Sequence, residues 1–452
     1  MKHMRSIVAI MAAFTLFVAT RSALAAGNSE AIKLPDDPTK AYITLGILVV
    51  AAVLFFTEAI PLACTAVAVP VALSLTKVVT SKTAFSFWGD PTVILFMAMF
   101  IVGEATFVTG FADRIGALAM RLSKGKPVLL LLYSMLVVGL LSGVLSNTGT
   151  TVVAVPMILG MCKRAKVAPS RILMPVAFAA SLGGTLTLVG TPPNGIVKSM
   201  LDQSGIKSFG FFEFAMIGLP LFVVGMLFYA LVGHRFLPQE TQASTEDVVA
   251  EEKPRRENKL WISIVVFVFV VVMMATELMP LSTAAMLGAL LVIATGCLTI
   301  NEAYRSVDWN TIFLFAGMLS MSAAMSSSGA AAIVASGVVG LVSDPWMIML
   351  ACCGLAAVIT NFMSNTATAA LLAPLALTIA KATNISPLPL VMGIAMSCSC
   401  CFLTPIATPP NTIVMGPGKY RFLEYAKYGW PLQLISLILC WLLIPLIWPF
   451  HT

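Results

Sequence analysis

The chain has 452 residues, of which 59% are apolar and only 10% are charged. Soluble domains carry about 25% charged residues, so this composition excludes a soluble globular protein and predicts a protein that crosses a membrane many times. The net charge of +7 does not indicate nucleic-acid binding, because Lys and Arg accumulate in the loops that a membrane protein keeps in the cytoplasm.

The N-terminal segment, 1–26, starts with basic residues, continues as an apolar stretch and ends in small residues before Gly27. This pattern is typical of a secretory signal, and it also fits an uncleaved first transmembrane helix. Both alternatives place the N-terminus in the cytoplasm and Gly27 outside. The topology of the remaining chain is therefore the same in either case.

Four short motifs occur twice, in the same order. FTEAIP recurs as ATELMP, TVILF recurs as TIFLF, and both SNT and TPPN are repeated, all at spacings of 217 to 219 residues. Such a period predicts two homologous halves, 41–236 and 260–450. The hydrophilic stretch 237–259 between them is the predicted linker.

The first half contains five apolar segments of spanning length and one segment that behaves differently. The five predicted spans are 41–57, 60–76, 91–110, 172–194 with its continuation, and 214–233. The stretch 128–162 is apolar on both sides of SNT and has basic residues at both ends, so we expect a re-entrant hairpin that enters and leaves on the cytoplasmic side. Its equivalent in the second half is 346–380.

Five spans per half invert the second half relative to the first, and the N-terminal segment brings the total to about 11 transmembrane helices. This topology places most of the 27 Lys and Arg residues in the cytoplasm, as the positive-inside rule requires. The predicted fold class is therefore an all-α polytopic membrane protein built from two inverted repeats, each with a re-entrant hairpin and a broken helix.

The repeated motifs predict uncoiled backbone at membrane depth, which is tolerated only inside protein or beside a watery cavity. Each TPPN stops a helix, because its two prolines lack amide donors. Helix N-termini favour anions, while helix C-termini and free carbonyls favour sodium ions. Neither SNT tip contains Lys or Arg. These features predict an anion site that is assisted by sodium. Ser and Thr that merely bond to their own helix are the structural alternative, and it is weakened by the repetition.

The sequence gives little indication of a metal site, a haem site or a catalytic triad. The nine cysteines are scattered except for Cys398, Cys400 and Cys401, which we interpret as packing residues, and the three histidines lie at chain ends or in a loop. No zinc, haem or Ser-His-Asp constellation can be assembled from them. We therefore expect neither an enzyme nor a cofactor, with sodium acting only as a coupling ion.

The stretches SNTATAALLAPLA, SLGGTLTLVGTPPN and TPIATPPNTIVMGPGKYRFLEYAKYGWPL resemble the divalent anion/sodium symporter family, which includes bacterial di- and tricarboxylate carriers. The resemblance runs from about Tyr42 to the C-terminus. It implies a homodimer in the bacterial inner membrane, in which a transport domain with the two hairpins moves like an elevator against a scaffold domain.

The resemblance also implies three sets of site residues. Sodium site 1 would involve Ser142, Ser146, Asn147 and Gly190. Sodium site 2 would involve Thr360, the carbonyl of Met363, Asn365 and Ala407. The substrate carboxylates would meet Ser146, Asn147, Thr148, Thr191, Ser364, Asn365, Thr366 and Thr408.

The predicted function is sodium-coupled uptake of small divalent anions, most simply the C4-dicarboxylates succinate, malate and fumarate. The alternatives are a sodium-independent dicarboxylate or citrate exchanger and a sulfate symporter. A channel is disfavoured, because inverted repeats with central breaks suit alternating access. Glu58 and Glu277 precede prolines at span ends and are interpreted as helix-terminal, whereas Glu104 lies inside an apolar run and is a candidate proton site.

Overall fold

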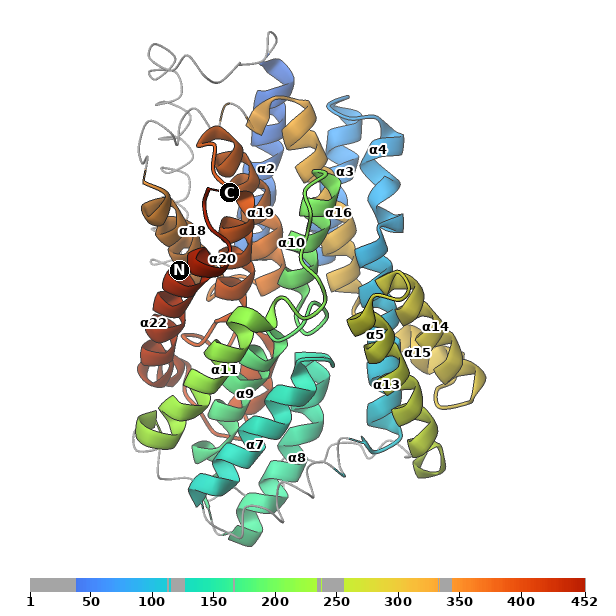
Figure 1. The fold of residues 1–452 in the computed structure, drawn as a ribbon, viewed down its shortest axis with the longest axis vertical. Coiled ribbons are helices and arrows are strands. Elements are labelled where there is room, and N and C mark those ends of the chain that lie inside the picture. Colours follow the sequence, from blue (N-terminus) through green and yellow to red (C-terminus); the bar gives the residue numbers. More distant parts are fainter. Residues whose placement is uncertain are drawn as a thin grey trace.

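The computed structural model describes residues 38–111, 114, 127–165, 167–233, 237, 256–331, 333 and 344–451. The N-terminal segment 1–26 and linker residues 238–255 lie outside these residues. The described part of the chain is helical, without strands. It confirms the predicted all-helical class (Figure 1).

The helices of the first half follow one another with short connections. They are α2 (Thr39–Thr57), α3 (Leu62–Leu75), α4 (Ser81–Ser86), η1 (Phe87–Gly89), α5 (Pro91–Val108), α7 (Pro127–Ser142), α8 (Asn147–Ala165), η2 (Pro169–Arg171), α9 (Leu173–Gly184), α10 (Pro192–Gln203), α11 (Ala215–Phe228) and η3 (Tyr229–Gly233).

The second half repeats this order. Its helices are η4 (Glu257–Lys259), α13 (Leu260–Thr276), α14 (Leu281–Ala294), α15 (Ile300–Ser306), α16 (Trp309–Ser327), α18 (Pro345–Ile359), α19 (Asn365–Ala382), α20 (Pro387–Ser399), α21 (Pro409–Met415) and α22 (Phe422–Ile447).

The two halves also share unusual backbone conformations. Glu58 after α2 and Glu277 after α13 are both left-handed helix C-caps, with φ of 48° and 52°. Gly110 and Gly329, which follow α5 and α16, have φ of 84° and 76°. A non-glycine residue rarely adopts positive φ, so matched positions indicate that both halves fold along the same path. They also confirm that the two glutamates are helix-terminal.

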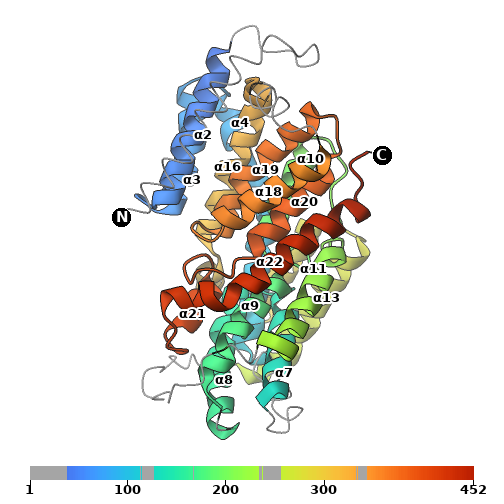
Figure 2. The same cartoon turned by 90° about the vertical axis from the view of Figure 1, so that its left-hand side faces the viewer.

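Two helical bundles each combine several helices of one half with a single helix of the other half (Figures 1 and 2). In the first bundle α16 packs against α2, α3 and α4, and in the second α5 packs against α13, α14 and α15. Gly317 on α16 lies so close to α3 that a Cβ there would overlap the Ala66 carbonyl oxygen. Small residues allow this approach, as is usual between helices in membranes.

Two buried hydroxyl pairs join the halves at equivalent places in the bundles. Thr44 on α2 donates to Ser328 after α16 over 3.1 Å. Ser263 on α13 and Thr109 after α5 lie 2.6 Å apart. A hydroxyl buried in an apolar bundle needs a partner, so both pairs hold the register between helices of different halves.

The remaining helices form a third group, which we call the hairpin core: α7–α11 and α18–α22. In both views α7 and α8 lie in the lower part of the molecule and α18 and α19 in the upper part (Figures 1 and 2). The core meets the bundles mainly through α10 and α19. Gly195 on α10 faces Phe96 and Phe315, whose ring centroids are 5.0 Å apart, and leaves no room for a Cβ.

Five described helices are long and apolar enough to cross a membrane alone: Thr39–Thr57, Ser81–Val108, Ala215–Gly233, Glu257–Thr276 and Phe422–Ile447. Shorter apolar helices include α7 and α18, the first arms of both hairpins. Helices of this length do not reach across a hydrocarbon core of about 30 Å. The first arms of the hairpins are thus too short to cross alone, whereas the second arms, α8 and α19, have 19 and 18 residues.

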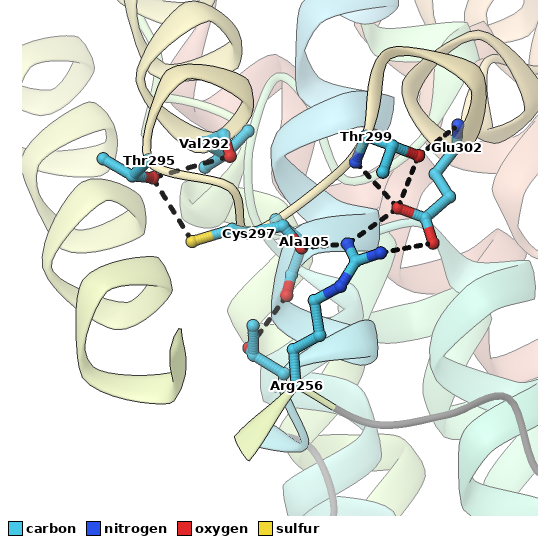
Figure 3. A network of polar contacts seen from close by, with 8 residues as sticks. Ala105, Arg256, Val292, Thr295, Cys297, Thr299 and Glu302 are labelled. Carbon is cyan, nitrogen blue, oxygen red and sulfur yellow. Dashed lines mark hydrogen bonds and ion pairs between the residues drawn. The ribbon is translucent and has the colours of Figure 1, made fainter. Parts of the chain in front are cut away.

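A charged clamp fixes the end of the linker (Figure 3). The guanidinium of Arg256 binds both carboxylate oxygens of Glu302, at 2.8 and 3.0 Å, and the carbonyl of Cys297 at 3.0 Å. Glu302 also caps α15 by accepting from the backbone amide of Thr299. Burial raises the pKa of Glu302, but the bonds from Arg256 and Thr299 and the Arg256 charge lower it to about 2.

We expect Glu302→Gln to lower the unfolding free energy by about 1 kcal/mol, because both partners are partly exposed and screened by water. The folded-state pKa lies below the ordinary value of 4.5. The carboxylate therefore stabilises the fold fully above pH 4.5, and this contribution is lost as the pH falls through 2. Thermal unfolding at pH 7 tests this, with the exposed Glu257→Gln as control. Equal melting temperatures for the two variants would contradict it.

Candidate functional site

The first predicted tip lies between α7 and α8. Ser142 is the last residue of α7 and is fully buried, and Asn147 is the first residue of α8 and half-buried. The Ser142 hydroxyl donates to the Asn147 side-chain oxygen over 2.5 Å. This bond holds the Asn147 side-chain amide at the tip of the hairpin. Ser146 and Thr148 flank Asn147 and are also half-buried.

The second tip has the same design. Thr360 follows α18, and its hydroxyl lies 2.8 Å from the Asn365 side-chain oxygen and 2.8 Å from the Cys398 carbonyl. Asn365 begins α19, and the preceding Ser364 caps that helix by accepting from the Ala367 amide. The equivalent Ser146 hydroxyl is 3.4 Å from the Gly149 amide, a long contact. Both tips thus present an asparagine amide at the N-terminus of a long helix.

Each TPPN motif begins a new helix after a break. The first break separates α9, which ends at Gly184, from α10, which begins at Pro192; the second precedes α21 at Pro409. Thr191 and Thr408 are the N-cap residues, buried and extended, with φ of −144° and −147°. Neither threonine hydroxyl caps its own helix. The Thr408 side chain instead meets the Cys401 thiol.

In the first half, the tip and the break come together. A Cβ on Gly184 would lie 2.7 Å from the Asn147 side-chain oxygen and 3.1 Å from the Gly190 carbonyl oxygen. A Cβ on Gly190 would lie 2.9 Å from the Gly143 carbonyl oxygen and would overlap that of Gly184. Glycines alone permit this approach. The result is a cluster of backbone carbonyls beside the Ser142–Asn147 pair.

In the second half, the same place is built from different residues. Cys401 occupies the position equivalent to Gly184, and its thiol lies beside the side chains of Asn365 and Thr408. Ala407 takes the position of Gly190, and both Ala407 and Met363 are 2% exposed. The tip and the break therefore meet in this half as well, with side chains where the first half has bare backbone.

The structure thus brings together each predicted tip with the break of its own half. Among the described residues, no hydrogen bond joins one tip to the other. The halves are connected by packing of α10 on α19 and of α21 on α8. Thr366 is buried on α19, and Glu104 is half-buried on α5 in the second bundle.

The oxygens of the first cluster are neutral carbonyl, hydroxyl and amide groups. The described residues contain no group of three or more His, Cys, Asp or Glu that could hold a metal. Neutral oxygens at unwound backbone are the donors that secondary transporters use for alkali cations. The N-termini of α8 and α19 at the tips favour an anion. The arrangement can therefore accommodate opposite charges side by side.

Sequence reasoning missed several residues that build these sites. Asn194 and Asn411 bridge the carbonyls of their breaks through the amide nitrogen, and Thr187 and Thr404 bond to the hairpins. The only signal in the sequence was the repetition of TPPN, whose asparagine was not assigned a role.

Comparison with known proteins places this chain among transporters. The family model CitMHS, described as "Citrate transporter", matches residues 52–378 and 322–450. The "Uncharacterized transporter YfbS" of Escherichia coli K12 is 25% identical, over 90% of this chain and 99% of its own length. The "Sodium-dependent dicarboxylate transporter SdcS" of Staphylococcus aureus is 26% identical, over 92% of this chain and 87% of its own.

Two solved structures share the fold. The YdaH transporter of Alcanivorax borkumensis gives a TM-score of 0.64 at 14% identity, covering 91% of this chain and 99% of its own. MtrF of Neisseria gonorrhoeae, described with a class of antimetabolite efflux pumps, gives 0.60 at 14% identity, covering 97% and 94%. At this identity the likeness concerns the fold alone.

Proposed function

Since the chain belongs to the CitMHS citrate transporter family, a family of membrane transporters and not of enzymes, we propose that it is a sodium-coupled importer of small dianions. The C4-dicarboxylates succinate, malate and fumarate are the first candidates. We place it in the bacterial inner membrane as a homodimer with a cytoplasmic N-terminus, working by an elevator mechanism.

The observation that carries this proposal is the composition of the two tip-and-break sites. Each offers hydroxyls, an amide and a helix N-terminus, and neither tip contains Lys or Arg. Burying a dianion beside neutral groups is costly unless mobile cations accompany it. The carbonyls of Gly143, Gly184 and Gly190 are suited to supply such a cation site. The name of the Staphylococcus aureus relative, a sodium-dependent dicarboxylate transporter, supports the same pairing of ions.

Reconstitution tests this proposal. Purified protein in proteoliposomes should take up radiolabelled succinate when an inward sodium gradient is imposed. Replacing sodium with potassium or choline should reduce uptake to the level of empty vesicles, because the anion would then lack its counter-charge. Unchanged uptake in potassium would contradict sodium coupling.

The family description favours citrate as a second candidate substrate. Competition by unlabelled citrate, sulfate and C4-dicarboxylates in the same vesicles ranks these anions. Uptake that requires a dicarboxylate inside the vesicles would instead identify an obligate exchanger, the sodium-independent alternative.

A further inference from the structure

A chain of hydrogen bonds runs from each TPPN motif to a hairpin. In the first half, the Asn194 side-chain nitrogen donates to the Thr187 carbonyl over 2.8 Å. The Thr187 hydroxyl then donates to the carbonyl of Gly143 in the hairpin tip. Three separate segments, namely the start of α10, the break and the tip, are thereby joined through one threonine.

The second half contains the same chain. The Asn411 side-chain nitrogen donates to the Thr404 carbonyl over 3.0 Å, and the Thr404 hydroxyl donates to the carbonyl of Asn361 over 2.5 Å. Thr187 and Thr404 occupy equivalent positions, as do Gly143 and Asn361. The same donors and acceptors recur although the neighbouring side chains differ. The bond pattern therefore belongs to both halves and not to one of them alone.

All four side chains are buried, with 0% exposure for both asparagines, 3% for Thr187 and 4% for Thr404. The side-chain oxygens of Asn194 and Asn411 have no hydrogen-bond partner among the described residues. An orphaned buried acceptor is unfavourable. The orientation of both asparagines is therefore set by their side-chain NH2 groups, which donate to backbone carbonyls of the break. These bonds hold the backbone of the threonine whose hydroxyl bonds to the tip.

The acceptors lie next to the groups that form the tips. Gly143 follows Ser142, which holds Asn147, and Asn361 follows Thr360, which holds Asn365. Each threonine thus fixes the backbone beside the residue that orients the tip amide. Loss of the hydroxyl would loosen the tip from the break. In the second half the Leu403 amide still donates to the Asn361 side-chain oxygen over 2.9 Å, so the effect there should be the smaller one.

We propose that Thr187 and Thr404 are positioning residues, each of which fastens one hairpin tip to its broken helix and thereby sets the affinity of the adjacent sodium site. This inference rests on the proposed function and adds residues to its site. Both threonine hydroxyls are buried and directed at tip carbonyls. Each keeps the ligand oxygens of two separate segments at the spacing that a cation requires.

Matched variants test the hydroxyl specifically. Thr187→Val keeps the side-chain shape and loses the hydroxyl, whereas Thr187→Ser keeps the hydroxyl. Uptake is measured in proteoliposomes at saturating dicarboxylate. The valine variant should need about tenfold more sodium for half-maximal uptake, because a smaller fraction of molecules holds the tip and the break in the arrangement that binds sodium. Its maximal rate at saturating sodium should stay near the wild type, and the serine variant should resemble the wild type. Thr404→Val and Thr404→Ser repeat the test in the second half.

Thr185→Val is the control, since Thr185 lies in the same break and is fully buried but bonds to Leu182 of its own helix. Sodium-induced protection against thermal unfolding provides a readout without transport. Valine and serine variants that behave alike in both assays would overturn the proposal. Failure of the proposed function would appear differently, as uptake by the wild type itself that is indifferent to sodium.

Discussion

Alanine at Asn147 or Asn365 should abolish transport, with uptake falling at least about 100-fold. Each asparagine oxygen is held by a hydroxyl, Ser142 in one half and Thr360 in the other, and each lies at the N-terminus of a long helix. In the proposed site each amide serves both as a cation ligand and as an anion donor, so its removal should delete both interactions. A hydrogen bond to a charged group contributes about 1.5–3 kcal/mol, so two such losses suffice for this effect.

Uptake of radiolabelled dicarboxylate measures the loss, and size-exclusion chromatography establishes that the variants remain folded. Asn310→Ala is the matched control, because Asn310 is exposed in the first turn of α16, and it should transport like the wild type. Normal uptake by both tip variants would remove the tips from the site.

The second large effect should come from Gly190→Ala. The new Cβ would overlap the Gly184 carbonyl oxygen and lie 2.9 Å from that of Gly143. Both neighbours are backbone atoms, so no side-chain rotation can relieve the conflict. The carbonyl cluster must open, and we expect sodium-dependent uptake to fall about 100-fold and stability to fall by about 1–3 kcal/mol.

Gly160→Ala on α8 supplies the control, because a Cβ there meets no atom within 4 Å. Uptake by Gly190→Ala that equals this control would show that the carbonyl cluster tolerates a methyl group. It would therefore place the cation elsewhere.

The sequence predicted the helix starts at the two TPPN motifs, for a local reason. Proline stops and starts helices by its own chemistry, and α10 and α21 indeed begin at Pro192 and Pro409. The tip asparagines stand out in the sequence because each is a polar residue in an apolar run and recurs at the equivalent place in the other half. Their binding roles stay predictions. The resemblance to divalent anion symporters is likewise confirmed by the family match. Sodium coupling, the elevator motion and the homodimer stay predictions.

The missed residues have a common cause. Thr187 and Thr404 look like ordinary membrane threonines, and their importance depends on which backbone carbonyl the folded break brings within reach. The same holds for Gly184, whose lack of a side chain matters only because Asn147 packs against it. Nor could the repeat indicate that α16 completes the bundle of α2 and α3, since internal similarity identifies units and not their partners.

Each bundle contains one helix from the other half of the chain, and this affects how the protein is assembled during synthesis. Helix α3 ends at Leu75, but its partner α16 begins only at Trp309, roughly 230 residues later. At 5–20 residues per second, the ribosome needs about 12–47 s to supply that partner. During this interval the surface of α3 that later receives Gly317 faces lipid or the insertion machinery. A nascent chain arrested after its first half would therefore leave α3 without α16 and α5 without α13 to α15.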